Sequence, residues 1–252
     1  MAAAWKGFKE LLVFDKVQED EVTTSLYLKD INGEELPPYI GGQFISVRVK
    51  NGESFSPARA YSLSSTYHKD FYRISIKKEE LGVVSPMLCD KVQIGDTLMS
   101  TAPVGKFCLK ESEKPAVFIG GGIGVTPMLA MAQDLENKTR PVHFVYSTKN
   151  SKFHSLKEEI AELKNHGDHL TSTVFYTRPL ETEVEGVDYD ICGRISKAWM
   201  QEHFPADADF YFCGPVPFMK TVYHNLVDMG VNPENIYYEL FEGGVDITKR
   251  DA

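Results

Sequence analysis

Residues 116–127 read Ala-Val-Phe-Ile-Gly-Gly-Gly-Ile-Gly-Val-Thr-Pro, and the architecture of the second half of the chain follows from this stretch. Its first part, 116–120, is a short apolar run of the kind found in buried strands, and it ends in a cluster of glycines. Thr126 is a favourable N-cap, and Pro127 fits the first helical position, where a missing N–H costs nothing. The stretch therefore predicts a strand, a tight turn and a helix.

The turn at 120–126 has the features of an anion-binding loop. Its glycines let the backbone approach a bulky ligand, and the free amides and dipole of the following helix end favour phosphate. It is not the full three-glycine dinucleotide fingerprint, because Pro127 stands where the third glycine would be. A tight strand–helix turn that binds nothing is the alternative at this point.

From residue 115 onward, expected strands alternate with expected helices. This alternation predicts a five-stranded parallel sheet with helices on both faces. Ligands of such sheets bind beyond the carboxyl ends of the strands, so the turns at 120–126 and 213–215 are the expected sites. We expect strands at 116–120, 142–146, 171–176, 209–213 and 236–239, and helices at 126–136, 155–164, 196–203 and 215–229.

The chain before residue 111 has a different rhythm, with short β-branched or alternating runs between turn signals. Many short strands at this spacing predict an antiparallel β-barrel or sandwich, with one short helix near 84–90. The charged segment 111–115 is the expected linker, so we predict one domain over 1–110 and a second over 111–252. The strands expected in the first domain are 9–17, 22–29, 43–49, 59–65, 71–78 and 97–101.

Charge and cysteine content exclude several classes of protein. The net charge of −9 and the absence of any Lys/Arg-rich block argue against nucleic-acid binding. The uncharged run 115–133 is broken by glycines and Pro127, so it does not predict a membrane span, and no secretion signal opens the chain. The scattered cysteines fit no metal site, disulfide framework or iron–sulfur cluster, and we expect reduced thiols in a cytoplasmic protein.

The first half carries its own candidate site at 59–65, Arg-Ala-Tyr-Ser-Leu-Ser-Ser. In an extended run, Arg59, Tyr61 and Leu63 point one way and the residues between them the other. A solvated strand is the alternative. The run 77–85, Lys-Lys-Glu-Glu-Leu-Gly-Val-Val-Ser, favours the binding interpretation, because a glycine and a serine that open a helix offer a second anion site. One phosphate site in each half is what two dinucleotides require.

Two stretches near the end of the chain complete the candidates. Cys213-Gly214-Pro215 follows an expected strand, and a buried packing role is the alternative for this cysteine. Glu239 and Phe241 end the last expected strand with a carboxylate and an aromatic ring. A glutamate at this place is able to shuttle protons, and a plain surface charge is the alternative.

With these stretches in this order, the chain resembles the ferredoxin–NADP reductase superfamily and, within it, the reductase part of flavohaemoglobins. The resemblance implies an antiparallel Greek-key flavin-binding barrel followed by a five-stranded parallel dinucleotide domain. It further implies that Arg59 pairs with the FAD pyrophosphate, that Tyr61 lies against the isoalloxazine and that Ser62 bonds near its N5. The implied cofactor-binding set is Arg59, Ala60, Tyr61, Ser62, Lys77, Gly82, Val83, Val84, Ser85, Gly121, Gly122, Gly124, Thr126, Pro127, Cys213, Gly214, Pro215 and Phe241, and the implied catalytic set is Tyr61, Ser62, Cys213 and Glu239.

The implied activity is transfer of a hydride from NAD(P)H to bound FAD, followed by release of single electrons. Neither a globin segment nor a ferredoxin domain is present in the chain, so we expect a separate acceptor: a haem protein, an iron–sulfur carrier or an oxygenase component. A flavin or ferric reductase that uses flavin as a diffusing substrate is one alternative, and a dinucleotide-binding regulatory subunit without turnover is another. The resemblance favours NADH over NADPH, and no metal site is expected.

Overall fold

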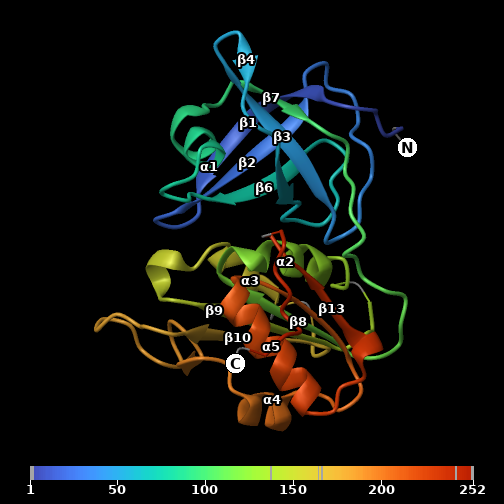
Figure 1. Cartoon of the computed structure of the whole chain (residues 1–252), viewed down its shortest axis with the longest axis vertical. Coiled ribbons are helices and arrows are strands. Elements are labelled where there is room, and N and C mark those ends of the chain that lie inside the picture. The colour runs from blue at the N-terminus through green and yellow to red at the C-terminus, as the bar shows by residue number, and fades with distance from the viewer. Residues whose placement is uncertain (1–2, 137, 164, 166, 242, 251–252) are drawn as a thin grey trace.

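The computed structural model describes residues 3–250 except 137, 164, 166 and 242. The chain builds two sheets of different kinds, which lie one above the other in Figure 1. The first half forms a seven-stranded sheet whose strand pairs are antiparallel, and the second half forms a six-stranded parallel sheet. The predicted fold class, an antiparallel β half followed by a parallel α/β half, is confirmed.

The antiparallel sheet closes into a barrel because one strand changes partners. Strand β5 (Arg59–Ser62) pairs with β3, and the next residue, Leu63, bridges to Ile74 in β6. The order β3-β7-β1-β2-β6 is thereby joined end to end, around a core of alternating apolar residues. The other strands of this sheet are β1 (Lys9–Gln18), β2 (Thr23–Asp30), β3 (Phe44–Asn51), β4 (Ser54–Phe55), β6 (Tyr72–Lys77) and β7 (Thr97–Ser100).

The short helix expected near 84–90 consists of two unlike pieces. It begins as α1 (Val84–Pro86) and continues as a π-helical turn, η1 (Met87–Lys91), where the Val92 N–H donates to the Met87 carbonyl over 3.0 Å. The ammonium group of Lys16 on β1 donates hydrogen bonds to two carbonyls at the end of this turn, those of Cys89 and Val92, each over 2.7 Å. The helix is therefore fixed against β1 on one side of the barrel.

The parallel sheet has six strands, so the prediction of five was wrong by one. The additional strand, β11 (Ile191–Cys192), pairs in parallel with the last two residues of β10. Two residues are too few to show a strand periodicity, which is why the sequence did not predict it. The order is β11-β10-β9-β8-β12-β13, and the predicted strands are β8 (Ala116–Gly121), β9 (Val142–Thr148), β10 (Leu170–Tyr176), β12 (Asp209–Cys213) and β13 (Ile236–Glu239).

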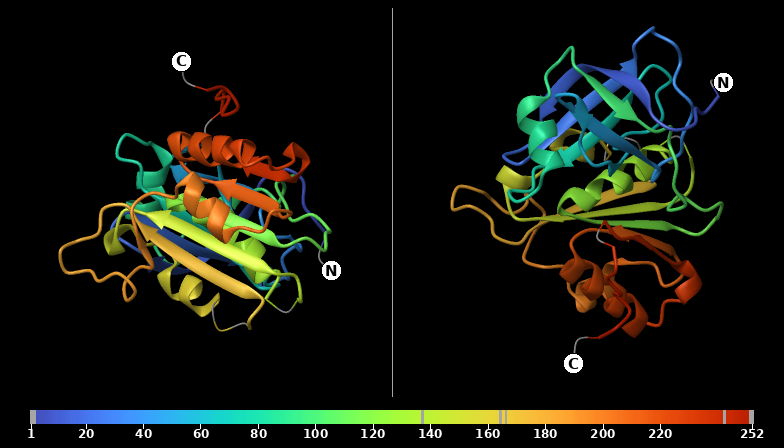
Figure 2. Two further views of the ribbon diagram at one scale, coloured as in Figure 1. Left: turned by 90° about the horizontal axis from the view of Figure 1, so that it is seen from below. Right: turned by 45° about the horizontal axis from the view of Figure 1, so that its top comes forward.

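Helices cover both faces of the parallel sheet, as predicted (Figure 2). On the face toward the barrel, α2 (Val125–Gln133) and α3 (Lys157–Leu163) pack on one apolar cluster with the strands. On the opposite face, α4 (Lys197–His203) and α5 (Val216–Asp228) pack on a second cluster. The predicted end of α3 at Lys164 lies outside the described residues. Among the helices that the structure describes, none has the length and apolar character needed to cross a bilayer.

Candidate functional site at the carboxyl edge of the parallel sheet

The carboxyl ends of three neighbouring strands place three predicted residues in one row. Cys213 of β12 pairs in register with Gly120 of β8 on one side and with Glu239 of β13 on the other. The Cys213 side chain is fully buried, and this burial, together with the charge of Glu239, raises the pKa of its thiol well above the ordinary value. Cys213 is therefore a neutral, buried thiol between Gly120 and Glu239.

Glu239 is the titratable group of this row. Burial raises the pKa of its carboxyl from the ordinary 4.5 to about 7. Burial, and to a smaller extent the charge of Glu239, also raises the pKa of the Cys108 thiol. A carboxyl that titrates near neutrality, at the edge where ligands of parallel sheets bind, is suited to holding or releasing a proton. Phe241 lies just beyond and is about half exposed.

Most glycines of the turn after β8 pack against the protein's own chain. A Cβ on Gly124 would lie 2.3 Å from the Cys213 carbonyl oxygen, and one on Gly121 would lie 2.7 Å from the Phe218 ring. Gly214 is as tightly placed, since its Cβ would come within 3.1 Å of the Gly121 Cα. These glycines let the ends of β8 and β12 approach each other, so close strand packing accounts for them without a ligand.

Gly122 differs from its neighbours in the turn. It has φ +52°, and a Cβ there would meet no atom within 4 Å. A left-handed residue that opens onto free space at the start of a helical segment is the kind of backbone cradle that a phosphate group occupies. Gly122 is thus the glycine of this turn that fits close approach to a dinucleotide.

The predicted helix start at Thr126 and Pro127 was wrong. A 3-10 turn, η2 (Gly122–Gly124), runs directly into α2, whose N-cap is Gly124. Thr126 is buried inside the first turn, and its hydroxyl donates to the Ile123 carbonyl over 3.0 Å. Pro127 is still tolerated, because the first N–H groups of a helix have no intrahelical partner. Pro215 is likewise the N-cap of α5 and not its first residue.

The flavin-motif residues of the barrel lie on β5, opposite β3. Tyr61 pairs with Ile45 and packs partly against the barrel core, and burial raises the pKa of its phenol to about 12. Ser62 is buried, whereas Arg59 and Ala60 are exposed. The Arg59 guanidinium donates to the Ala58 carbonyl over 2.9 Å and otherwise faces outward. A half-buried ring beside an exposed cation fits a planar ligand that carries a pyrophosphate.

The second predicted phosphate loop, before α1, is held by a side chain. The Glu79 N–H donates to the Ser85 hydroxyl over 3.1 Å, and the Gly82 N–H donates to the Glu79 carbonyl over 2.9 Å. Lys77 Nζ bonds the Glu79 carboxylate over 2.8 Å. Val83 points to solvent while Val84 is buried, so the exposed backbone of this loop lies around Gly82 and Val83.

The two halves meet directly, and most residues of this contact were not predicted from the sequence. The 3-10 turn η2 lies against β6 of the barrel. Asp134 at the end of α2 accepts hydrogen bonds from the Gly41 N–H, over 2.7 Å, and from the Thr66 hydroxyl, over 2.6 Å.

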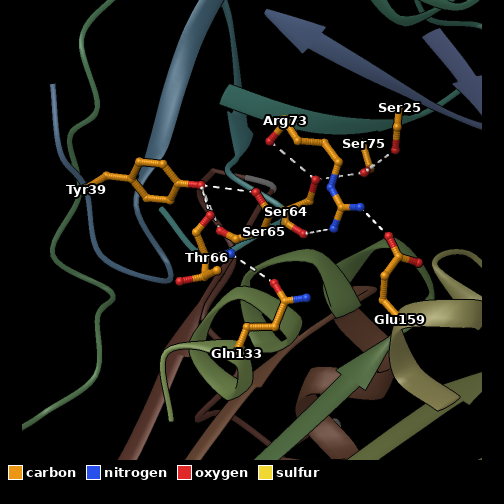
Figure 3. Close-up of polar contacts among 9 residues, drawn as sticks. All are labelled: Ser25, Tyr39, Ser64, Ser65, Thr66, Arg73, Ser75, Gln133 and Glu159. Atoms are coloured by element: carbon orange, nitrogen blue, oxygen red, sulfur yellow. Dashed lines mark hydrogen bonds and ion pairs between the residues drawn. The ribbon is translucent and has the colours of Figure 1, made fainter. Parts of the chain in front are cut away.

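A second contact between the halves is ionic: Arg73 of β6 forms an ion pair with Glu159 of α3 (Figure 3). In the sequence, the pair Gly41-Gly42 is the feature that could have indicated the contact between the halves. A Cβ on Gly41 would come within 2.6 Å of the Met131 N of α2, so only glycine fits there.

Within the described part of the chain, no group of three or more His, Cys, Asp or Glu side chains is placed to hold a metal ion. The four cysteines are all free thiols. The described residues at this edge offer an open backbone cradle at Gly122, the half-exposed ring of Phe241 and the carboxyl of Glu239.

Comparison with protein families matches both halves of the chain. Residues 15–108 match the oxidoreductase FAD-binding domain, and residues 118–224 match the oxidoreductase NAD-binding domain. A flavohemoprotein of Bacillus anthracis is 40% identical over 247 residues, which cover 94% of this chain and 61% of the relative. A flavohemoprotein of Deinococcus radiodurans is 39% identical over 241 residues, covering 94% and 60%. The chain thus spans about 61% of the length of the curated relatives it matches.

Solved structures give the same result. The flavohem-like FAD/NAD-binding domain of a nitric oxide dioxygenase from Vibrio cholerae superposes with a TM-score of 0.84 at 31% identity, over 93% of this chain and 99% of that one. Phthalate dioxygenase reductase superposes with a TM-score of 0.75 at 24% identity, over 95% and 70%. The second likeness shows the fold alone.

Proposed function

Because the chain belongs to the FAD- and NAD-binding oxidoreductases that include the reductase part of flavohemoproteins, we propose that it reduces bound FAD with NAD(P)H and passes the electrons to a separate acceptor. We assign FAD to residues 1–110 and NAD(P)H to residues 111–252. The observation that carries this proposal is the contact of η2 with β6, because it brings the dinucleotide turn of one half against the barrel strand that leads into the flavin loop.

The residues present fit both cofactors. The exposed backbone around Gly82 and the Arg59 guanidinium supply donors for one pyrophosphate, and the open cradle at Gly122 supplies them for the other. FAD accepts a hydride as an electron pair and is able to release the two electrons singly, which nicotinamide does not do. Tyr61 offers one face for the flavin ring, and Ser62 is a hydroxyl donor on the same strand.

Glu239 and Cys213 form the wall of the proposed transfer site. Cys213, neutral and buried, would close the sheet edge beneath a nicotinamide ring bound beyond the ends of β8 and β12. Glu239, with its pKa near 7, is the group that we propose to hold or supply a proton when the flavin changes charge.

The acceptor and the location form the finer part of the proposal. We propose a haem group as acceptor, because the similar curated proteins are flavohemoproteins. We also propose a cytoplasmic location, supported by four cysteines that are all free.

An anaerobic absorption experiment tests the proposed function. The purified protein is reconstituted with FAD, freed of unbound flavin and mixed with NADH or NADPH. We expect a bound-flavin spectrum that bleaches rapidly with one nucleotide, and reoxidation when cytochrome c is added as a one-electron haem acceptor. A protein that stays colourless after FAD addition contradicts the proposal and supports a regulatory subunit, whereas flavin that is reduced but lost on gel filtration supports a diffusing-flavin reductase.

A further inference from the structure

A buried arginine joins the two halves of the molecule beside the proposed transfer site. Arg73 lies on β6, on the face opposite Tyr72 and Ile74, whose side chains are in the barrel core. Its side chain is only 6% exposed, and its guanidinium lies between the Tyr27 ring of the barrel and the Glu159 carboxylate of α3 in the second half. Figure 3 shows this guanidinium between the segment just beyond β5, which carries Ser64, and the helix that carries Glu159.

The two ends of the guanidinium contact different halves. One terminal nitrogen donates to the carbonyl of Ser64, which closely follows the flavin-motif residue Ser62 in sequence. The other terminal nitrogen pairs with the Glu159 carboxylate of α3. One side chain therefore connects the segment just beyond the flavin strand β5 to a helix of the dinucleotide half.

A row of hydroxyls fixes the barrel side of this connection. Ser75 donates to the Ser64 hydroxyl over 2.8 Å, and the Ser25 and Ser75 hydroxyls share a bond of 2.6 Å. The Ser64 N–H also donates to the Arg73 carbonyl over 3.0 Å. All of these serines are buried, so the segment beyond β5 has little freedom to move relative to β6.

A buried ion pair is a poor source of net stability, because desolvation of the two charges offsets their attraction. Its directional geometry is a better reason for its presence, since the planar fork of arginine holds two acceptors at fixed angles and the lysine ammonium does not. The dinucleotide turn η2 lies against the same strand β6, and Asp134 fixes the far end of α2 to Gly41 and Thr66. The second half is thus attached to the barrel on both sides of this turn, by the Arg73–Glu159 pair and by the hydrogen bonds of Asp134.

We propose that Arg73, with Glu159, is a positioning residue that sets how the nicotinamide cradle approaches the flavin strand. The inference rests on the proposed function and adds to it a residue that touches neither cofactor. Loss of the connection lets the halves settle at a slightly different separation, and hydride transfer is steeply sensitive to such displacements.

The test measures flavin reduction by anaerobic stopped flow in the holoenzyme. Glu159→Gln and Arg73→Lys are compared with the wild type for limiting rate at saturating nucleotide, half-saturation concentration, FAD content and melting temperature. We expect the limiting rate to fall by roughly tenfold in each, with FAD content and half-saturation within about twofold, because positioning affects the transfer step itself. The double variant should be no slower than Arg73→Lys alone, as expected for two groups in one interaction.

A matched control is available in the same interface. Lys152 and Glu21 also pair between the halves, over 2.9 Å, but each side chain is 52% exposed. Lys152→Gln should leave the limiting rate unchanged, since exposed pairs contribute little. Wild-type rates in both Glu159→Gln and Arg73→Lys overturn the inference, as does a loss of rate that only follows loss of FAD. A wild-type flavin that no nucleotide reduces overturns the proposed function instead.

Discussion

The two turns that we propose to hold pyrophosphates are built in opposite ways. In the dinucleotide half, the turn after β8 is held by backbone contact, with Gly124 pressed against the Cys213 carbonyl. In the flavin half, the turn before α1 is held by hydrogen bonds from the Glu79 N–H to the Ser85 hydroxyl and from the Gly82 N–H to the Glu79 carbonyl, and Leu81 at its tip is fully exposed. The first turn has no room to relax, while the second keeps side chains that are able to move. Substitutions in the dinucleotide turn should therefore lower the stability of the fold strongly, whereas substitutions in the flavin turn should have smaller effects, mainly on cofactor retention.

Gly124→Ala should have the largest effect of any single change in either turn. Its Cβ would lie 2.3 Å from the Cys213 carbonyl oxygen and 2.6 Å from the Gly214 N, so backbone would have to move. We expect a loss of about 3 kcal/mol or more, at the upper end of the cost of overpacking a core. Thermal unfolding measures it, and a melting temperature close to that of the wild type would show that the strand ends are less tightly packed than we describe.

Gly122→Ala is the matched contrast within the same turn. A Cβ there meets nothing within 4 Å, and only the left-handed φ of +52° opposes it, at a cost of about 1 kcal/mol. The variant should fold, yet its half-saturation concentration for nucleotide should rise, because the methyl group occupies the proposed cradle. Unchanged nucleotide affinity would remove Gly122 from the binding site and would leave the turn with a packing role alone.

Glu239→Gln tests the carboxyl that borders the dinucleotide turn. Burial raises the pKa of this group from an ordinary 4.5 to about 7, so the fold favours its neutral form. Its contribution to stability is fully present below pH 4.5 and is lost as the pH rises to about 7, because the native state then binds more protons than the unfolded state. The glutamine variant should lack this decline.

Melting temperatures measured at several values from pH 4 to 8 give the comparison, with the wild type falling relative to Glu239→Gln across this window. Parallel curves would show that the carboxyl titrates at its ordinary pKa. The same variant should lose the pH dependence of flavin reduction near neutrality if Glu239 is the proton-holding group.

Ser85→Ala tests the flavin turn and should cost less than Gly124→Ala. The substitution removes the acceptor of the Glu79 N–H, worth about 1 kcal/mol for one hydrogen bond in a partly exposed loop. The loop should loosen, and FAD should dissociate more readily while nucleotide affinity is retained. Flavin retention during dialysis measures this effect, and retention equal to the wild type would show that the backbone alone shapes the loop.

The strands and the order of the candidate sites could be predicted from the sequence because they depend on local chemistry. Apolar runs with turn residues between them placed the strands on both sides of the linker, and the Cys213 and Glu239 row follows from parallel strands ending at one edge. The start of α2 was wrong because several residues after a glycine turn are able to begin a helix, and the packing of Gly124 on β12 decides between them.

The contact between the halves shows why other features could not be predicted. The run 72–77 alternates apolar and polar residues, so a single sequence places Arg73 on a solvated face. In the folded chain Arg73 instead pairs with Glu159 of α3, which lies far along the chain, and this ion pair spans the two halves. Similarly, the four glycines of 120–124 look alike in sequence, and only their neighbours in space separate packing from an open cradle.

Lys149→Ala should have the smallest effect and refines the dinucleotide side of the comparison. Lys149 follows β9, where a cation would favour the 2′-phosphate of NADPH, but its ammonium lies 4.4 Å from the centre of the Phe153 ring. We propose NADH as the donor, so the half-saturation concentration for NADH should stay within about twofold of the wild type, as expected for a surface charge. Steady-state reduction of ferricyanide at varied NADH and at varied NADPH measures the half-saturation concentration for each nucleotide. A large loss confined to NADPH would instead assign Lys149 to the 2′-phosphate and make NADPH the donor, because only that phosphate distinguishes the two nucleotides.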